Sequence, residues 1–198
     1  MLNNGLHDLD PRKLAALVTF LVHDLSGVGD APGLPLGYRL ERLGAPDFAR
    51  YCAVYRAVGE DWLWFSRLRM PEEELWQILH ASKVHALELV GPDGAAGLLE
   101  LDFRDEKAPE LAFFGLVPGA VGLGLGKALM GEALARAKAA GAREFYVHTC
   151  SLDHPRALDF YCRSGFRPFR RAVEVFDDPR LDGTLRKDAA RWMPVIAP

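Results

Sequence analysis

The sequence predicts an α+β fold in which a mixed β-sheet is flanked by helices. Two observations lead to this prediction. Strand-like and helical segments follow one another between residues 37 and 176 in the order β-α-α-β-β-β-α-β-α-β. Two of the strands meet at Gly91-Pro-Asp-Gly94, a turn signal that predicts a hairpin. The chain has 198 residues, 49% apolar and 26% charged, so it can build one sizeable core but is short for two domains.

The first half of this order is predicted from apolar runs bounded by turn residues. Strands are expected at residues 37–43, 84–90 and 96–103, and helices at 46–58 and 71–80. Pro71 suits the first turn of its helix, and the three glutamates after it favour the positive end of the helix dipole.

The second half is organised around a glycine-rich loop. An apolar strand at residues 111–117 stops at Pro118, glycines follow at positions 119, 122, 124 and 126, and a helical pattern then runs over 126–140. Gly141 ends that helix. A strand at 145–149, a helix at 156–164 and a last strand at 166–176 complete the order. Gly115, inside the strand before the loop, is consistent with a β-bulge.

Two segments lie outside this order. Residues 1–36 are expected to form an N-terminal extension, in which residues 14–22 are apolar and β-branched enough for an added strand at a sheet edge, although a helix is nearly as compatible. Residues 177–198 are expected to form a C-terminal tail that folds over the core through Trp192 and Ile196. Residues 37–176 between them form the main domain.

The glycine loop between a strand and a helix suits a phosphate or pyrophosphate, because unpaired N–H groups of the helix point at the ligand. A Walker loop does not fit, since Val121 stands at its first glycine and Ala128 at its hydroxyl residue. A dinucleotide fingerprint does not fit either. Leu129 stands at its third glycine, and the motif falls past mid-chain.

A third pattern fits better. Residues 121–126, Val-Gly-Leu-Gly-Leu-Gly, resemble the acetyl-CoA signature of the GNAT superfamily of N-acetyltransferases, whose core is Gln/Arg-x-x-Gly-x-Gly/Ala after an apolar strand. Both terminal glycines of the signature, Gly124 and Gly126, are present. Val121 replaces the usual basic or amide side chain, which removes one side-chain contact but no main-chain contact.

A second block supports the resemblance. Residues 154–166 are similar to the family's Asn-x-x-Ala-x-x-x-Tyr-x-x-x-Gly-Phe block, with Ala157, Tyr161, Gly165 and Phe166 in register. His154 stands where the family usually has the asparagine that contacts the pantetheine arm. The two motifs occur in the right order, and the resemblance covers roughly residues 37–175.

The resemblance implies a GNAT-like fold, with a mixed, mostly antiparallel sheet splayed at its central strands. It implies an N-acetyltransferase that moves the acetyl group of acetyl-CoA to a primary amine by direct attack in a ternary complex. The residues expected at the acetyl-CoA site are Leu116, Val117, Val121, Gly122, Leu123, Gly124, Leu125, Gly126, Lys127, His154 and Tyr161. The alternative is a non-catalytic sensor or interaction module that binds CoA on the same fold.

The chemistry requires that the amine loses a proton and that the leaving thiolate gains one. Tyr161 matches the family's tyrosine that protonates the sulfur, and its alternative is a core tyrosine. Glu110 stands at the family's frequent glutamate position and is the candidate base, and its alternative is an exposed charge before a strand. Glu100 and Asp102, two residues apart and therefore on one face of a strand, are the competing carboxylates.

The aromatic stretch between the first two helices is the expected acceptor site. Trp62 and Trp64 could wall a pocket, in which Glu60 or Asp61 would attract a cationic amine. Ordinary core packing under a loop is the alternative. Glu100 and Asp102 are also assigned to the acceptor site, and the acceptor is expected to be a small-molecule or peptide amine.

The remaining features narrow the class of protein. A net charge of −3 gives no reason to expect binding to nucleic acid or to an anionic membrane. No run of 18 apolar residues and no signal-peptide pattern occur, and three cysteines without framework spacing indicate reduced thiols in the cytoplasm. His148, Cys150, His154 and Cys162 lack zinc-type pairs, so no metal is expected, and His148 and Cys150 are expected to line the CoA arm or to pack. A homodimer is one possible assembly.

Overall fold

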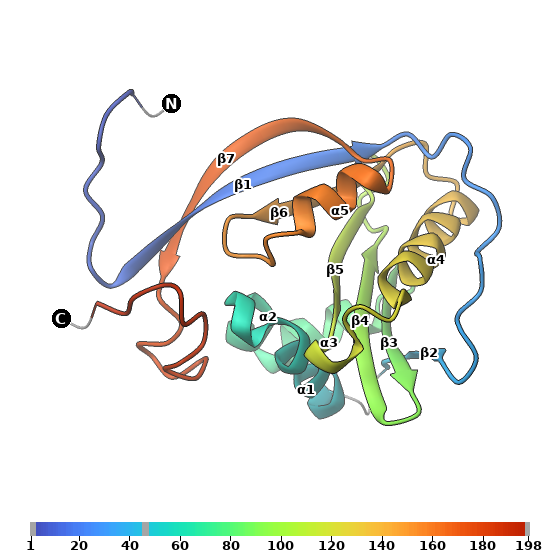
Figure 1. Ribbon diagram of the computed structural model, residues 1–198, viewed down its shortest axis with the longest axis horizontal. Coiled ribbons are helices and arrows are strands. Elements are labelled where there is room, and N and C mark those ends of the chain that lie inside the picture. The colour runs from blue at the N-terminus through green and yellow to red at the C-terminus, as the bar shows by residue number, and fades with distance from the viewer. Residues whose placement is uncertain (1–2, 45–47, 197–198) are drawn as a thin grey trace.

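The computed structural model describes residues 3–44 and 48–196 and contains one seven-stranded sheet in the order β2-β3-β4-β5-β6-β1-β7 (Figure 1). The strands are β1 (Lys13–His23), β2 (Arg39–Arg42), β3 (Val84–Gly91), β4 (Gly94–Asp102), β5 (Glu110–Leu116), β6 (Phe145–Cys150) and β7 (Arg167–Asp177). Every neighbouring pair is antiparallel except β5 and β6, which are parallel. The predicted α+β fold with a mixed, mostly antiparallel sheet is therefore confirmed.

The helices form two layers, one on each face of the sheet. They are α1 (Phe48–Gly59), η2 (Glu60–Trp62), α2 (Ser66–Arg69), α3 (Glu72–His80), η3 (Pro118–Ala120), α4 (Leu125–Ala139) and α5 (Ala157–Arg163). Leu98 of β4 packs with α1 and α3, whereas the next residue, Leu99, packs with α4 and α5. Because successive side chains of a strand point to opposite faces, the two helix layers lie on opposite sides. The expected start of the first helix, at residues 46–47, lies outside the described residues.

Strand β1 forms as one of the two predicted alternatives, but its expected place at a sheet edge is wrong. It lies between β6 and β7 and pairs with both, and β7 is the edge strand instead. The reason is burial on both faces. Leu14 and Ala16 pack against the C-terminal segment, while Leu21 packs into the core beneath α4 and α5. Figure 1 shows β1 and β7 as a long curved ribbon beyond β6 and α5.

The sheet opens between β5 and β6. Among the described residues, these strands pair at only one position, Glu110 with Tyr146, and the rest of β5 has no strand partner on that side. The bulge expected at Gly115 is wrong, because the register shift in β5 falls opposite Glu100 and Leu101. Gly115 instead makes room for α1, since a Cβ there would lie 2.4 Å from Cγ1 of Val58.

The C-terminal segment packs on the core, in part through Trp192, whose ring contacts that of Trp62, but mainly through residues that were not predicted. Leu185, Ala189 and Ala190 are buried against β1 and the loop after β6. Trp192 and Ile196, the expected anchors, remain about half exposed. Within the part of the chain that the structure describes, no helix is long and apolar enough to cross a membrane.

Candidate active site

A cavity of about 1040 Å³ opens where β5 and β6 separate. Its walls come from β5, the glycine loop with the start of α4, the loop after β6 with α5, the η2 region and the C-terminal segment. A space of this size can hold a large ligand together with part of a second one. The cavity therefore defines the candidate active site.

The glycine loop forms one end of the cavity. Gly122 has φ +92° and Gly124 has φ +76°, a left-handed backbone that other residues rarely adopt. The N–H groups of residues 122–126 donate to no acceptor within the described ranges, and these residues lead into and begin the 15-residue helix α4. Lys127, Arg156 and Arg163 also line the cavity, with no ion pair in the described part of the chain. Free N–H groups and three cations together suit a pyrophosphate.

The structure brings most of the predicted acetyl-CoA residues to this cavity. Those that line it are Leu116, Val121, Gly122, Gly124, Gly126, Lys127, His154 and Tyr161. Three do not. The N–H of Val117 donates to the carbonyl of Ala96 at 3.0 Å, Leu125 is buried in the core, and Leu123 is exposed to solvent.

Tyr161 reaches the cavity from α5. Its ring packs edge-on against Phe114 and Phe166, and the side chain is only 7% exposed. Burial, together with the negative charge of Asp153, raises the pKa of Tyr161 well above its ordinary value. The phenol is therefore a protonated group at neutral pH, and no residue in the described ranges accepts a hydrogen bond from it.

Glu110 lies at the point where β5 and β6 begin to separate, outside the lining of the cavity. Its Oε1 is 2.7 Å from Nδ1 of His148, which lies on the neighbouring strand β6 and does line the cavity. The hydrogen bond to Glu110 raises the pKa of His148, although burial opposes it. The carboxylate and the imidazole form a pair whose imidazole end faces the cavity.

Glu100 and Asp102 are both drawn away from the cavity by arginines. Glu100 is fully buried, where it forms an ion pair with Arg67 and accepts a hydrogen bond from the hydroxyl of Tyr51. Asp102 is bound by the guanidinium of Arg104, with Oδ2 and Nη2 2.5 Å apart. Neither carboxylate lines the cavity, so the structure does not bring them to the expected acceptor site.

Trp62 and Trp64 both line the cavity. Nε1 of Trp64 donates to Oδ1 of Asp153 at 3.1 Å, and the other oxygen of Asp153 accepts from the hydroxyl of Thr149 and the N–H of Cys150. These bonds fix the loop after β6 against the aromatic wall. The ring of Trp62 contacts the rings of both His154 and Trp192.

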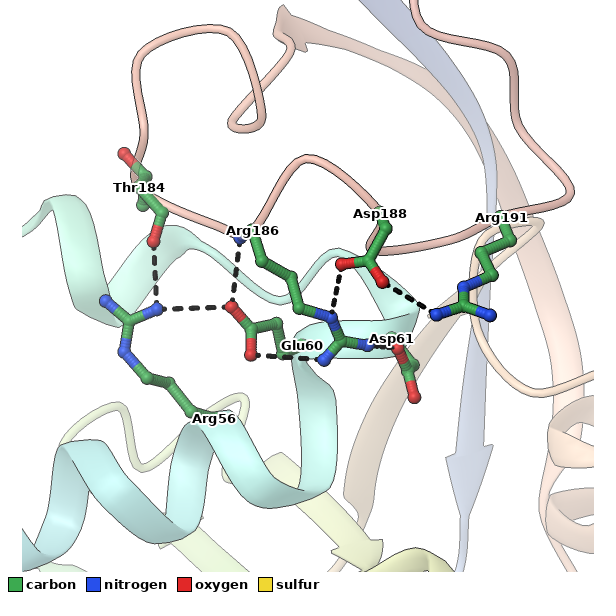
Figure 2. Close-up of polar contacts among 7 residues, drawn as sticks. All are labelled: Arg56, Glu60, Asp61, Thr184, Arg186, Asp188 and Arg191. Carbon is green, nitrogen blue, oxygen red and sulfur yellow. Dashed lines mark hydrogen bonds and ion pairs between the residues drawn. The ribbon is translucent and has the colours of Figure 1, made fainter.

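Glu60 and Asp61 are paired with Arg186 of the C-terminal segment (Figure 2). Glu60 also accepts from the guanidinium of Arg56, which in turn donates to the carbonyl of Thr184 at 2.9 Å. Their negative charge is thus already balanced within the chain. This end of the cavity is therefore not an open cation site.

Glu174 of β7 is the carboxylate that remains available in the cavity. It lines the wall, and no hydrogen bond or ion pair to it exists within residues 3–44 and 48–196. It lies close enough to His148 for its charge to favour the protonated imidazole. Glu174 and Arg186 were missed in the sequence because long-range packing, rather than a local motif, brings them to the site.

The glycine loop, the open side of β5 and the buried Tyr161 are consistent with the family that comparison with known proteins identifies. A sequence model described as the Acetyltransferase (GNAT) family matches residues 51–166, more than half of the chain. The chain therefore belongs to the GNAT acetyltransferase family, whose members transfer acyl groups from CoA. A search of curated protein sequences found no significant match.

Solved structures support the same fold. A GCN5-related N-acetyltransferase from Sphaerobacter thermophilus is similar, with a TM-score of 0.61 and 20% identity over 82% of this chain and 52% of its own. The chain thus spans about half the length of that relative. The PaiA N-acetyltransferase from Thermoplasma acidophilum, solved in complex with coenzyme A, has a TM-score of 0.55 and 18% identity over 72% of this chain and 99% of its own.

Proposed function

We propose that this chain is an acetyl-CoA-dependent N-acetyltransferase that acts on a primary amine by direct attack in a ternary complex. The observation that carries the proposal is a single cavity joining three features. They are the free N–H groups of the glycine loop, the unpaired side of β5, and the buried phenol of Tyr161. These are the groups that the reaction needs at its two ends, and the family's chemistry supports their combined use.

The CoA end is assigned to the glycine loop and the cations beside it. Backbone N–H groups of residues 122–126 would hold the pyrophosphate, with Lys127 and Arg156 adding charge. Unpaired N–H groups of β5 would bind the pantetheine arm and polarise the thioester carbonyl.

The proton transfers are assigned to His148 and Tyr161. Neutral His148 would take the proton from the attacking ammonium, with Glu110 orienting the imidazole through the 2.7 Å hydrogen bond. The free amine then forms the bond to the acetyl carbon, and the C–S bond breaks. Tyr161 would give its proton to the departing sulfur, and the second proton that the attacking nitrogen loses as the amide forms would return to the Tyr161 phenolate, directly or through solvent. Glu110 is therefore a positioning residue, and the predicted roles of Glu100 and Asp102 find no support in their position.

The acceptor is assigned to the aromatic and acidic wall on the far side of the thioester. Glu174 offers a negative charge near His148, and Trp62 and Trp64 offer apolar ring faces. This combination favours a cationic small-molecule or peptide amine with an apolar body.

A non-catalytic CoA-binding module is the second candidate, favoured by Val121 and His154 at positions where the family usually has other side chains. The two candidates are separated by incubating the protein with acetyl-CoA and a panel of amines while free thiol is measured. Thiol release that depends on an amine supports the enzyme. CoA binding by calorimetry without such release for any amine would identify the module.

Tyr161→Phe tests the assigned acid. The interaction of the phenol with sulfur strengthens only as the C–S bond breaks, so its loss should lower kcat and leave acetyl-CoA binding unchanged. Positioned acids contribute about 10²–10⁴-fold, so we expect at least a roughly tenfold fall in kcat. Tyr55→Phe is the matched control, since Tyr55 is another buried tyrosine but lies outside the cavity lining. Parent-like kcat in Tyr161→Phe would leave Tyr161 with only a packing role.

A further inference from the structure

The side chain of Trp64 crosses the opening between β5 and β6. Its Nε1 donates to Oδ1 of Asp153, in the loop after β6, at 3.1 Å. Its Cη2, on the six-membered ring, lies against β5, where a Cβ on Gly115 would be only 3.4 Å away. One side chain thus contacts both halves of the sheet at the place where the two strands separate.

The indole of Trp64 is held from several sides. The backbone N–H of Trp64 donates to the carbonyl of Gly59 at 3.0 Å, and the ring lies directly on Gly59, where a Cβ would come within 2.2 Å of its Cδ2. The ring also contacts the rings of Tyr55 and Phe113, whose centroids are 5.5 Å and 5.2 Å away. Gly59 therefore provides the space in which the indole lies, and the packing fixes its orientation.

The open side of β5 carries the groups assigned to the thioester. The N–H of Val117 donates to the carbonyl of Ala96, on the β4 side, at 3.0 Å. Because alternate residues of a strand direct their backbone groups to the same neighbour, the N–H groups of Phe114 and Leu116 point to the open side. A thioester carbonyl bound by these N–H groups would lie next to Gly115.

The side chains at this part of β5 alternate between the two faces of the sheet. The ring of Phe114 stacks on that of Phe160 of α5, with 5.5 Å between centroids. Gly115 faces the other side, where Cγ1 of Val58 and the edge of Trp64 fill the space that a side chain would occupy. Val58 and Trp64 both line the cavity. An acyl group that extends past Gly115 therefore meets these two residues.

We propose that Trp64 limits the length of the acyl group, so that acetyl-CoA is used while butyryl-CoA and longer thioesters are rejected. The inference rests on the proposed function, because it takes the thioester to lie on the open side of β5. The arm of CoA would enter from the glycine loop, on the face of α4 and α5. Its acyl group would then point across the opening toward the indole.

The wall that Trp64 forms resists displacement because its hydrogen-bond partner is itself fixed. Oδ2 of Asp153 accepts from the hydroxyl of Thr149 at 2.7 Å and from the N–H of Cys150 at 2.8 Å. An indole that turned away would leave Oδ1 of Asp153 without its donor and would lose its contacts with Tyr55 and Phe113. Extra methylene groups forced into such packing typically lower a binding or rate constant about 10–100-fold.

The first test compares CoA thioesters of increasing chain length with one fixed amine, and measures kcat/KM from the release of free thiol. The parent should use butyryl-CoA about 10–100-fold less well than acetyl-CoA. In Trp64→Ala the ratio of kcat/KM for butyryl-CoA to that for acetyl-CoA should rise at least about tenfold. Trp64→Phe keeps a ring over Gly59, but this ring is shorter and cannot bond to Asp153, so the ratio should lie between those of the parent and Trp64→Ala.

Trp62→Ala is the matched control. Trp62 also lines the cavity, but its ring contacts those of His154 and Trp192 rather than β5. The ratio for butyryl-CoA and acetyl-CoA should therefore stay at the parent value, whatever happens to the KM for the amine. Circular dichroism of each variant checks folding.

The second test measures binding of the two thioesters without an amine, so it does not depend on turnover. Isothermal titration should show that the parent binds butyryl-CoA more weakly than acetyl-CoA by about tenfold, and that Trp64→Ala removes most of this difference. If no thioester gives amine-dependent thiol release, the proposed function fails, and this titration still decides whether Trp64 limits the acyl group.

Equal use and equal binding of acetyl-CoA and butyryl-CoA by the parent would overturn the proposal. So would an unchanged ratio in a folded Trp64→Ala, or a rise of the same size in Trp62→Ala. If Trp64→Ala does not fold, Trp64→Phe and the chain-length profile of the parent decide in its place.

Discussion

Tyr161 and His148 face the same cavity, and their surroundings act on their pKa values in the same direction by different causes. Burial raises the pKa of the phenol, while the hydrogen bond that the imidazole donates to Glu110 raises the pKa of the imidazole despite partial burial. A phenol that keeps its proton suits an acid, and an imidazole held by a carboxylate suits a base whose orientation is fixed. The two residues can therefore serve opposite ends of one reaction.

Replacing Glu110 with Gln tests this pairing through the pH profile. The raised pKa of His148 should return toward its ordinary value, so the acid limb of kcat/KM should move to lower pH. The maximal rate should fall, since the remaining base is weaker and less well oriented. Kinetics with a fixed amine across pH 5–9 measure both effects.

Asp102→Asn is the control for this experiment, because Asp102 carries a carboxylate at the end of the neighbouring strand but binds Arg104 rather than His148. Its acid limb should stay in place. An unshifted acid limb in Glu110→Gln would remove Glu110 from the proton path. The contribution of the Glu110–His148 pair to folding stability depends on pH in the opposite sense to the activity. It is complete at low pH and is lost as the pH rises through the raised pKa of His148.

At the level of elements, the glycine loop and the splayed strand act together. The left-handed Gly122 and Gly124 turn the chain so that the start of α4 faces the opening, and Gly115 lets α1 approach β5 closely. The loop supplies main-chain donors, and the open side of β5 continues them along the cavity. In the proposed mode of CoA binding, most contacts would thus come from the backbone, with side chains in a supporting role.

This division predicts a clear order of effects on CoA binding. Gly124→Val places a β-branched residue at φ +76°, which is strained and redirects the N–H groups, so the dissociation constant should rise more than about tenfold. Lys127→Ala removes one exposed charge and should cost less than about tenfold. Isothermal titration with CoA measures both. The reverse order would contradict the assignment of the loop.

At the level of the whole molecule, the C-terminal segment completes the site by an ionic and an apolar attachment. Arg180 is 1% exposed and binds Asp178 with Nη2 and Oδ2 2.7 Å apart, and it also donates to the carbonyls of Ala189 and Met193. This buried pair holds the segment that carries Arg186 over the cavity. The segment is therefore a fixed wall rather than a free tail.

Arg180→Met should lower the free energy of unfolding by about 3–5 kcal/mol, because it leaves a buried carboxylate without a partner. Burial raises the pKa of Asp178, but the bonds from Arg180 lower it more, so its net pKa lies below the ordinary value. The pair's contribution is full above the ordinary pKa and lost as pH falls through the lowered one. Urea unfolding should therefore show a difference from the parent that shrinks in acid.

Arg191→Met is the matched control, since Arg191 pairs with Asp188 on the surface and is 80% exposed. Its cost should stay below about 1 kcal/mol. Equal destabilisation by the two substitutions would mean that burial of the Arg180 pair contributes nothing to holding the C-terminal segment.

The sequence by itself determined the order of elements, the glycine loop and the position of Tyr161, because these depend on local patterns. Turn residues, a period of apolar side chains and two motifs fix them within short stretches of chain. The splay of the sheet followed from the resemblance that those motifs carry. Even the ends of α4 and α5 fall within a residue or two of the expected bounds.

Only the tertiary structure decided which charges reach the cavity. Glu100 and Asp102 are two residues apart, a spacing shared by any two side chains on one face of a strand. No local sequence pattern predicts their ion pairs with Arg67 and Arg104. His148 meets Glu110 because two strands far apart in sequence lie in parallel, and β1 lies between β6 and β7, with buried side chains on each of its faces. Long-range pairing of charges and strands depends on the whole packing, which a local pattern does not carry.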